Sequence, residues 1–229
     1  MSKYETITIG GYRIIKVVTG QPWMENCYLV SHSPSGEQAL IDPGDDADSI
    51  IQAILENGTQ LQYILLTHAH HDHVGAVAAL CRHFDLPCRV HKNDVRLLRH
   101  APMYALRFAN KRIQAADRIE VFDEKGYFPL GEQLIQVIHT PGHTAGSVCF
   151  SFNNFVFTGD TLLNQYIGRT DLPGGDKALL KSSVNQLLPR LTSETILFPG
   201  HGKLWTVEQA DTWWKKVAES APEFTRLGA

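Results

Sequence analysis

Short apolar runs alternate with turn-forming residues along most of the chain, and this alternation predicts a mixed α/β fold. Runs bounded by Gly, Pro, Asn, Asp or Ser are typical of buried strands. Segments with helical spacing lie between several of these runs, as in domains built from packed layers of strands and helices. The predicted strands cover residues 27–30, 38–41, 63–66, 134–138, 147–152, 155–157 and 195–198.

Four further segments have the apolar spacing of helices. They cover residues 45–58, 74–84, 178–191 and 206–220. The first opens with acidic residues, which are favoured in the first turn of a helix. The third contains Pro189, which should end that helix early because proline lacks a backbone N–H. The fourth begins with Thr206 and has Gln209 three residues later, which is a capping-box pattern.

The segment from about residue 92 to residue 118 combines basic and apolar side chains. This combination predicts a helix that packs on one side and is basic on the other. Whether the segment is a lid, a substrate clamp or the face of a dimer stays open. Its basic residues are Lys92, Arg96, Arg99, His100, Arg107, Lys111, Arg112 and Arg118.

Composition and charge are those of an ordinary globular protein. The chain has 229 residues, of which 43% are hydrophobic and 20% charged, and no low-complexity stretch or long linker divides it, so we expect a single domain over residues 1–229. A formal net charge of −3 gives no argument for nucleic acid or an anionic membrane as a partner. We therefore expect a small-molecule substrate, and the sequence does not predict the oligomeric state.

The cysteines and the start of the chain bear on the compartment. The four cysteines lack CxxC spacing and are expected to be buried thiols in a reducing environment. No secretory signal is evident after Met1, and no apolar run approaches the ~18–20 residues that span a bilayer. These features predict a cytoplasmic protein.

Four of the predicted strands are each followed directly by a His or an Asp. The segments are YILLTH (63–68), VIHTPGH (137–143), FVFTGD (155–160) and ILFPGH (196–201). In three of them the preceding residue is glycine, which lets the backbone turn sharply beside a ligand. If these strands share a common orientation, their loops emerge at one edge, where α/β folds place their sites.

The stretch THAHHDHVG (67–75) supplies several of these side chains at once. His68 and His70 are two residues apart, so an extended chain points both to one side. Asp72 and His73 follow where a helix should begin, so one loop offers two pairs of ligands. The complete candidate set is His68, His70, Asp72, His73, His143, Asp160 and His201. One metal ion with an open position uses three or four ligands, whereas this set suits two ions ~3.5–4 Å apart.

A histidine-rich patch that binds metal only weakly is the simpler alternative. Such a patch would not explain the His or Asp that follows each of three other strands. His71 and His139 break the ligand spacing, and we expect them beside the ligands rather than among them. Four other histidines are expected to be ordinary surface or core residues: His32, His83, His91 and His100.

The sequence H-A-H-H-D-H at 68–73 resembles the HxHxDH motif of the metallo-β-lactamase superfamily. Further segments that resemble this family are IDPG (41–44), TPGHTAGSV (140–148), FTGDTLL (157–163) and FPGHG (198–202). The resemblance spans most of the chain. It implies a four-layer αββα sandwich, in which two mixed sheets pack face to face with helices outside and the metal ions lie at one edge.

The resemblance also implies how the ligands divide. The first ion would be held by His68, His70 and His143, and the second by Asp72, His73 and His201. Asp160 would bridge the two ions, and Asp42 would orient the histidine loop. Zinc is the expected metal, with iron and manganese as alternatives, because all three share N and O ligands.

Within the superfamily the chain most resembles glyoxalase II and its short bacterial relatives. The segment FTGDTLLNQYIGRTDLPGG (157–175) carries this likeness. Full-length glyoxalase II continues into a helical domain that helps to hold glutathione, whereas only 28 residues follow His201 here. This departure counts against glutathione binding in its usual form. No cysteine stands at a ligand position, which ranks antibiotic hydrolysis low.

The resulting hypothesis is a binuclear, metal-dependent thioester hydrolase in which a metal-bridging hydroxide attacks the thioester carbonyl. Asp72 and Asp160 would be its catalytic carboxylates. Arg169, Lys203 or the basic 92–118 segment would attract a substrate carboxylate, although Arg169 could instead pair with Asp171.

Three alternatives stay open. The first is a mononuclear iron persulfide dioxygenase, for which two histidines and one carboxylate would suffice. Those relatives have PAHDY where this chain has FPGHG (198–202), which favours the hydrolase. The second is a lactonase of the same fold. The third is a sensor or interaction module that binds metal without turnover, and the complete ligand set argues against it.

Overall fold

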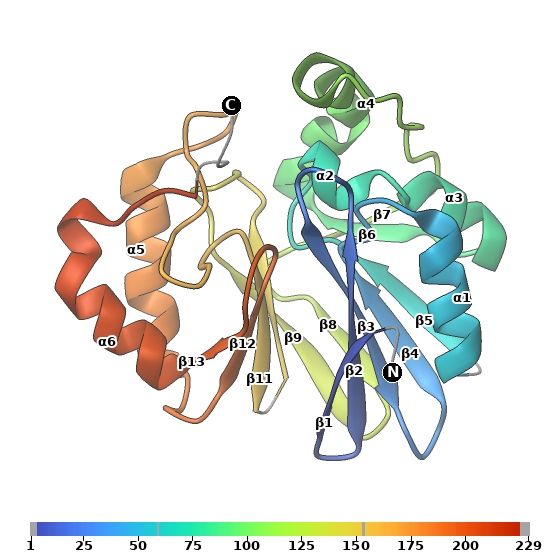
Figure 1. Cartoon of the computed structure of the whole chain (residues 1–229), viewed down its shortest axis with the longest axis horizontal. Coiled ribbons are helices and arrows are strands. Elements are labelled where there is room, and N and C mark those ends of the chain that lie inside the picture. The colour runs from blue at the N-terminus through green and yellow to red at the C-terminus, as the bar shows by residue number, and fades with distance from the viewer. Residues whose placement is uncertain (1–3, 59, 153, 225–229) are drawn as a thin grey trace.

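The computed structural model describes residues 4–58, 60–152 and 154–224 as two β-sheets that pack face to face (Figure 1). The first sheet is antiparallel from β1 to β4 and parallel from β4 to β7. In spatial order its strands are β1 (Glu5–Ile9), β2 (Tyr12–Thr19), β3 (Glu25–His32), β4 (Glu37–Ile41), β5 (Gln60–Leu65), β6 (Cys88–His91) and β7 (Ile119–Phe122).

The second sheet is also mixed. Strands β11 and β12 are parallel, and the other neighbours are antiparallel. In spatial order its strands are β13 (Trp205–Thr206), β12 (Ile196–Pro199), β11 (Phe155–Gly159), β10 (Val148–Ser151), β9 (Gln133–His139) and β8 (Tyr127–Leu130). All of the strands predicted from the sequence are present.

Helices cover the outer side of each sheet (Figure 1). Those on the first sheet are α1 (Ala47–Asn57), α2 (His71–Val74), α3 (Val77–Phe84) and α4 (Val95–Ala109), and those on the second are α5 (Lys177–Leu187) and α6 (Val207–Val217). Short 3₁₀ turns span Lys92–Asp94, Leu188–Arg190 and Ala218–Ser220. The arrangement confirms the predicted αββα sandwich.

Three hydrophobic clusters correspond to the three contacts between these four layers. The cluster between the sheets is rich in aromatic side chains, and the ring centroids of Tyr28 and Phe157 are 5.1 Å apart. The second cluster packs β-strands of the first sheet against α1, α3 and α4, and the third packs the second sheet against α5 and α6. Each fully buried large apolar side chain contributes about 1.5–3 kcal/mol, so these clusters hold the sheets in a fixed relation.

The helix predicted over 74–84 is divided in the structure. It separates into α2 and α3 at Gly75 and Ala76, where the amide of Ala76 donates to the carbonyl of Pro43. A side chain at position 75 would meet the Gly44 carbonyl oxygen at 2.2 Å, so the two backbone segments touch there. This close contact of α2 with the 43–44 segment interrupts the regular helix.

The helix predicted over 92–118 is also shorter than expected. It ends at Ala109 because Asn110 adopts a left-handed backbone conformation with φ 49°. Beyond it, Lys111 pairs with Asp45 and Arg118 pairs with Asp85. These two cations therefore belong to surface contacts and not to a continuous basic face on the helix.

Several strands escaped the sequence analysis. They are β1, β2, β6, β7, β8 and β13. Strand β2 carries the lysine and arginine of YRIIKVVT among its apolar residues, and β7, β8 and β13 have at most four residues, so none forms the clean apolar run that was used to find the others.

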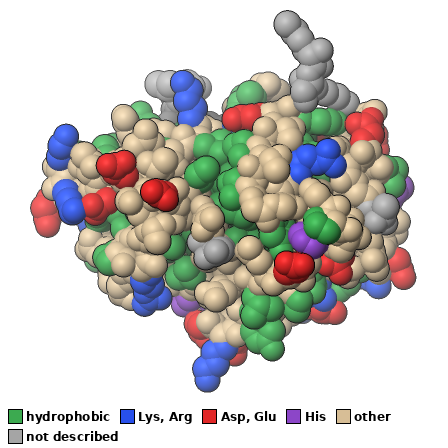
Figure 2. All heavy atoms as spheres, turned by 90° about the horizontal axis from the view of Figure 1, so that it is seen from below, with side chains coloured by type: hydrophobic (Ala, Val, Ile, Leu, Met, Phe, Trp, Pro, Cys, Tyr) green, Lys and Arg blue, Asp and Glu red, His purple; other side chains and the backbone are tan. Residues whose placement is uncertain are grey.

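The surface away from the strand ends that carry α2 and α4 has no dominant charge. Figure 2 shows this opposite end, where acidic and basic side chains are interspersed. All four cysteines are buried and free, as predicted. Within the described residues, no helix combines the length and apolarity needed to cross a membrane.

The capping box predicted at Thr206 is present and gives a first test. The Thr206 hydroxyl accepts from the Gln209 amide at 3.3 Å, and the Gln209 side chain accepts from the Thr206 amide at 3.0 Å. Thr206→Ala should lower the free energy of unfolding by about 1 kcal/mol, measured by urea denaturation. Thr212→Ala, an exposed interior position of the same helix, should leave stability unchanged or slightly higher. Equal stability of Thr206→Ala and the wild type would show that the cap contributes nothing.

Candidate metal centre

The seven candidate ligands follow the ends of four strands that meet at one edge of the sandwich. His68, His70, Asp72 and His73 follow β5, and His143 follows β9. Asp160 directly follows β11, and His201 follows β12 at the same edge. The chain therefore brings together residues that are more than one hundred positions apart.

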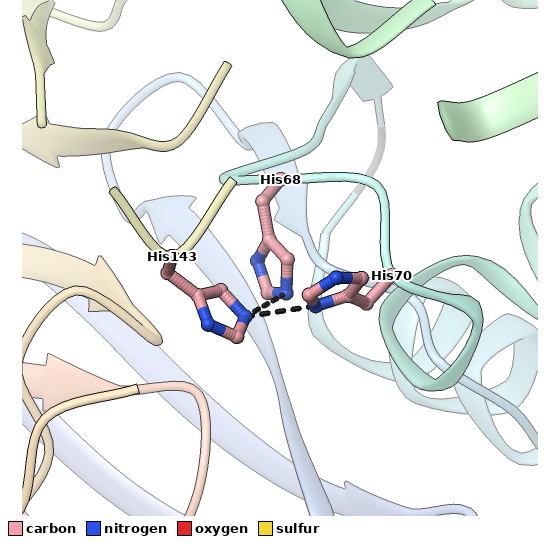
Figure 3. Close-up of side chains that lie close together, drawn as sticks. All are labelled: His68, His70 and His143. Atoms are coloured by element: carbon pink, nitrogen blue, oxygen red, sulfur yellow. Dashed lines mark hydrogen bonds between the residues drawn. The ribbon is translucent and has the colours of Figure 1, made fainter. Parts of the chain in front are cut away.

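The first group consists of His68, His70 and His143 (Figure 3). Nε2 of His143 lies 3.2 Å from Nε2 of His68 and 2.8 Å from Nδ1 of His70. All three side chains are buried, and one nitrogen from each lies within 4.8 Å of the others. This geometry can enclose a single metal ion.

The second group consists of Asp72, His73 and His201. Nε2 of His73 lies 3.2 Å from Nε2 of His201, and Oδ2 of Asp72 lies 3.5 Å from that same His201 nitrogen. One ligand atom from each residue again lies within 4.8 Å of the others. The loop after β5 thus contributes to both groups.

The carboxylate of Asp160 lies between the two groups. Its Oδ2 is 3.6 Å from Nε2 of His143 in the first group and 3.7 Å from Nε2 of His201 in the second. Its Oδ1 is 3.6 Å from Nε2 of His73, and this oxygen is buried with no hydrogen-bond partner among the described residues. A single carboxylate can therefore reach ions in both groups.

Outer hydrogen bonds fix the orientation of the imidazoles. Nδ1 of His143 donates to the carbonyl of Arg169 at 2.7 Å, and Nδ1 of His201 donates to the carbonyl of Trp23 at 3.1 Å. Nδ1 of His73 lies 3.1 Å from Oδ2 of Asp42. Since Nδ1 carries the proton in each ring, the Nε2 lone pair points inward, as in protein metal sites.

These inward lone pairs test whether the residues fit metal ions. In each group two imidazole Nε2 atoms face each other at 3.2 Å, and a cation between them can bind both lone pairs. The Oδ1 atom of Asp160 is buried without a hydrogen-bond partner among the described residues, and a bound cation would stabilise it. Imidazole nitrogen and carboxylate oxygen are the ligands of divalent zinc, iron and manganese. The residues therefore fit a pair of divalent metal ions.

Burial keeps the first group in its metal-binding form. It lowers the pKa of His68, His70 and His143, and neighbouring imidazoles lower the pKa of the first two further. Neutral imidazoles result, and neutral imidazole is the form that binds a metal ion.

Carboxylates change the balance in the second group. Burial is the largest effect and acts to lower the pKa of His73 and His201, but nearby carboxylates together outweigh it. Asp160, Asp42 and Asp72 raise the pKa of His73, and Asp160 and Asp72 raise that of His201. Burial also acts to raise the pKa of Asp72, yet the His201 and His73 side chains hold it well below its usual value. Asp72 is therefore ionised and available as an anionic ligand.

Asp42 supports the histidine loop from below. Its Oδ1 accepts from the Thr67 amide at 2.7 Å, and its Oδ2 accepts from the Thr67 hydroxyl at 2.5 Å. The same Oδ2 accepts from His73, so one carboxylate orients the start of the loop and one imidazole. Gly159, with φ +48°, lets β11 pass close by, since a side chain there would meet the Thr67 hydroxyl at 2.3 Å.

The first sheet also positions His201. The Asn26 amide at the start of β3 donates to the carbonyl of Gly200 at 2.8 Å, and the Tyr28 hydroxyl donates to the carbonyl of Pro199 at 2.7 Å. These bonds join β3 to the end of β12 across the sandwich. The ligand that comes last in the sequence is thus held against the sheet that carries the first ones.

Asp94 joins two ligand loops and was not found from the sequence. It is buried, and its Oδ2 accepts from the Ala69 amide at 3.0 Å and from the Thr144 hydroxyl at 2.8 Å. Its Oδ1 accepts from the Gly146 amide at 2.8 Å. The carboxylate thereby ties the loop of His68 and His70 to the loop of His143. It lies in a segment that the sequence marked as basic, and no local pattern pointed to it.

A cavity of about 370 Å³ opens over both metal groups. Three aromatic side chains from distant segments wall it: Trp23, Phe108 and Phe224. The Phe224 ring stacks on the His201 ring with centroids 5.0 Å apart, because the chain after α6 returns to the site. None of these three residues was predicted as part of the site, since single aromatic residues in loops or helices carry no local signature.

The two predicted substrate cations lie in different places. Arg169 lines the cavity, but its guanidinium donates to both Asp171 oxygens at 2.7 Å. Lys203 is exposed and is not among the residues that line this cavity. The pairing that was considered for Arg169 is therefore present.

The remaining histidines lie outside the two groups. His71 lines the cavity and packs edge-on against the Trp23 ring, with centroids 5.4 Å apart. His139 stacks on His91, with centroids 4.4 Å apart, and its Nε2 bonds the Ala145 carbonyl. His91 is fully buried, so it is a core residue as expected.

Sequence comparison with known proteins identifies the family to which this chain belongs. Residues 20–201 match the family model of the metallo-beta-lactamase superfamily. Hydroxyacylglutathione hydrolase GloC of Haemophilus influenzae is 35% identical over 199 residues, which cover 85% of this chain and 93% of that protein.

Two solved structures have similar folds at comparable identity. TTHA1623 in a di-iron-bound form has a TM-score of 0.76 at 38% identity, covering 85% of this chain and 95% of that chain. The B3 metallo-beta-lactamase BLEG-1 has a TM-score of 0.76 at 35% identity, covering 86% of this chain and 95% of that chain.

Proposed function

Since this chain belongs to the metallo-β-lactamase superfamily and has the fold of its metal-dependent hydrolases, we propose that it hydrolyses thioesters at two divalent metal ions, as a glyoxalase II-like enzyme. The observation that carries the proposal is the Asp160 carboxylate, which lies within 3.7 Å of nitrogens from both ligand groups. This position suits a ligand that bridges two ions. The name of the similar protein GloC, hydroxyacylglutathione hydrolase, supports a thioester as substrate.

The bound ions would supply hydroxide near neutral pH, by lowering the pKa of water toward ~7, and would polarise the carbonyl of the substrate. Asp160 would keep the two halves of the site at a fixed spacing. Asp72, held ionised by its low pKa, would accept a hydrogen bond from the attacking water and so direct it. The departing thiol has a pKa near ~8.5, so it can leave as thiolate without a strong acid beside it.

The walls of the cavity would exclude water from the reacting groups. Trp23, Phe108 and Phe224 present apolar surface around the two metal groups. Removing water strengthens the electrostatic interactions of the site and limits side reactions. The volume of about 370 Å³ accommodates a short acyl group beside the ions.

Zinc is the metal we favour, and iron is the main alternative. The ligand set alone does not select between them, because both bind imidazole and carboxylate. The similar protein TTHA1623 was solved in a di-iron-bound form, which supports a site for two ions and makes iron the main alternative to zinc.

The alternative hypothesis, a persulfide dioxygenase, requires a single iron ion. It has no use for a second complete group, yet Asp72, His73 and His201 are assembled with ligand atoms within 4.8 Å. Hydrolysis of β-lactams is a further candidate activity, because the similar structure BLEG-1 is named as a metallo-beta-lactamase. Both reactions belong in the same assay series.

The test is turnover by protein loaded with zinc or with iron. We expect saturable hydrolysis of S-lactoylglutathione, loss of that activity with a chelator, and about two ions per chain by metal analysis. Failure to hydrolyse this or any other acyl thioester would reject the proposal. Oxygen uptake with glutathione persulfide would indicate the dioxygenase, and turnover of nitrocefin or of a lactone without thioesterase activity would indicate another hydrolase.

A further inference from the structure

A groove continues from the metal cavity along α4. We call it the α4 groove, and it lies between α4 and the segments 144–145 and 173–174, with a volume of about 640 Å³. A narrow neck joins the two spaces. Phe108 and Leu172 line both the metal cavity and the neck, whereas Leu97 and Tyr104 line both the neck and the α4 groove. The metal cavity and the α4 groove are therefore neighbours along the helix, joined by a neck of about 10 Å³.

One face of α4 lines this path from end to end. Arg96, His100, Tyr104 and Phe108 recur every four residues, which places them on the same side of the helix. At 1.5 Å per residue, the row is about 18 Å long. Tyr104 and Phe108 stack with ring centroids 6.0 Å apart. The path is thus aromatic beside the metal cavity and basic at its far end.

The basic end has no acidic partner of its own. Among the described residues Arg96 forms no ion pair, whereas Arg169 is paired with Asp171 and Arg118 with Asp85. Asp94 also lines the α4 groove, but it is buried and both of its oxygens already accept hydrogen bonds. The guanidinium of Arg96 is therefore available to an anion that enters the groove.

We infer that the thiol half of the substrate lies in the α4 groove and ends in a carboxylate or a phosphate that Arg96 binds. This inference rests on the proposed thioesterase function. The metal cavity of about 370 Å³ would take the reacting carbonyl with a short acyl group, and the longer thiol half would extend past the neck along α4. A guanidinium binds carboxylate and phosphate in the same two-pronged geometry, so both sources of the anion share one chemistry. Arg96 is accordingly a specificity-determining residue.

The experiment compares three thioesters with the same lactoyl group on the metal-loaded enzyme. The thiols are glutathione with carboxylates, coenzyme A with phosphates, and neutral N-acetylcysteamine. We expect the wild type to have a higher kcat/KM for at least one charged thioester than for the neutral one. Arg96→Gln should reduce that ratio roughly three- to fivefold, through KM, as expected for an ion pair made by an exposed guanidinium. Arg99→Gln, on the same helix outside the groove lining, should leave the ratio unchanged.

The outcomes separate this inference from the proposed function. Loss of preference for one charged thiol identifies the anion as carboxylate or phosphate. An unchanged ratio in Arg96→Gln, or a wild type that prefers the neutral thioester, overturns the inference while thioesterase activity stands. If Arg96→Gln instead alters the preference for a charged acyl group, as in a succinyl thioester, then the acyl half and not the thiol half lies in the α4 groove, and the inference is overturned. Absence of turnover with every thioester rejects the proposed function and this inference with it.

Discussion

Replacing Asp160 with Asn should lower kcat/KM for thioester hydrolysis on the order of a thousandfold, which corresponds to about 4 kcal/mol of transition-state stabilisation. The substitution keeps the size of the side chain and removes the negative charge that lies within 3.7 Å of ligand nitrogens in both groups. Without that charge the two ions would repel each other across the site, so we expect metal content to fall from about two ions per chain toward one. Steady-state kinetics and metal analysis on the same preparation measure both effects.

Asp211→Asn is the matched control for this loss. Asp211 lies on the outer helix α6, where its carboxylate pairs with Lys215 one turn away, and exposed pairs of this kind contribute little to stability. We expect wild-type kinetics and metal content from the control. An Asp160→Asn protein that keeps both full activity and two ions would show that the binuclear model is wrong.

The sequence predicted the ligand loops well because their chemistry is local. Each loop that carries candidate ligands begins at the end of a strand, and the end of a buried strand can be recognised from apolar residues and glycine without knowledge of the fold. The sequence alone therefore predicted that His68 and Asp160 lie at one edge, and in the structure both lie beside Nε2 of His143. Their proximity depended on a common strand orientation, which the αββα arrangement provides.

The supporting residues could not be predicted in the same way. Asp94 and Phe224 act through contacts with segments about fifty and twenty positions away, and nothing in their own neighbourhood differs from an ordinary helix start or a chain end. The division of the 74–84 helix has the same origin, because it depends on the Gly44 carbonyl oxygen, which lies against Gly75. Local sequence patterns predict which segments form helices and strands, whereas contacts between distant segments can interrupt a helix, as at Gly75.

The role of α4 illustrates the same limit. Its sequence predicted a helix with one basic side, but the basic residues separate into different roles in the structure. Lys111 pairs with the first sheet's loop residue Asp45, and Arg96 lines the α4 groove. Sequence spacing alone assigns both to one charged segment, and only the packing of the helix over the metal cavity distinguishes them.

Asp94→Ala should destabilise the fold by about 3–5 kcal/mol and weaken metal binding at the same time. The substitution leaves the amides of Ala69 and Gly146 and the hydroxyl of Thr144 without their acceptor in a buried place. Each unsatisfied buried donor costs about 1–3 kcal/mol, and relaxation of the loops offsets part of the sum. The loops that this carboxylate joins carry His70 on one side and His143 on the other, so zinc affinity should also fall about 10–100-fold.

Urea denaturation of metal-free protein isolates the structural part of this effect, and a competitive zinc titration measures the rest. Asp123→Asn is the control, since Asp123 is exposed and accepts from the Lys125 amide in a turn away from the metal ligands. Because Asp94 binds no metal ion itself, a simple structural role predicts lower stability with unchanged affinity in the fraction that remains folded. Lower affinity in that folded fraction would instead establish that the carboxylate holds the two ligand loops at the spacing that the ions require, and an Asp94→Ala protein as stable as the wild type would contradict both roles.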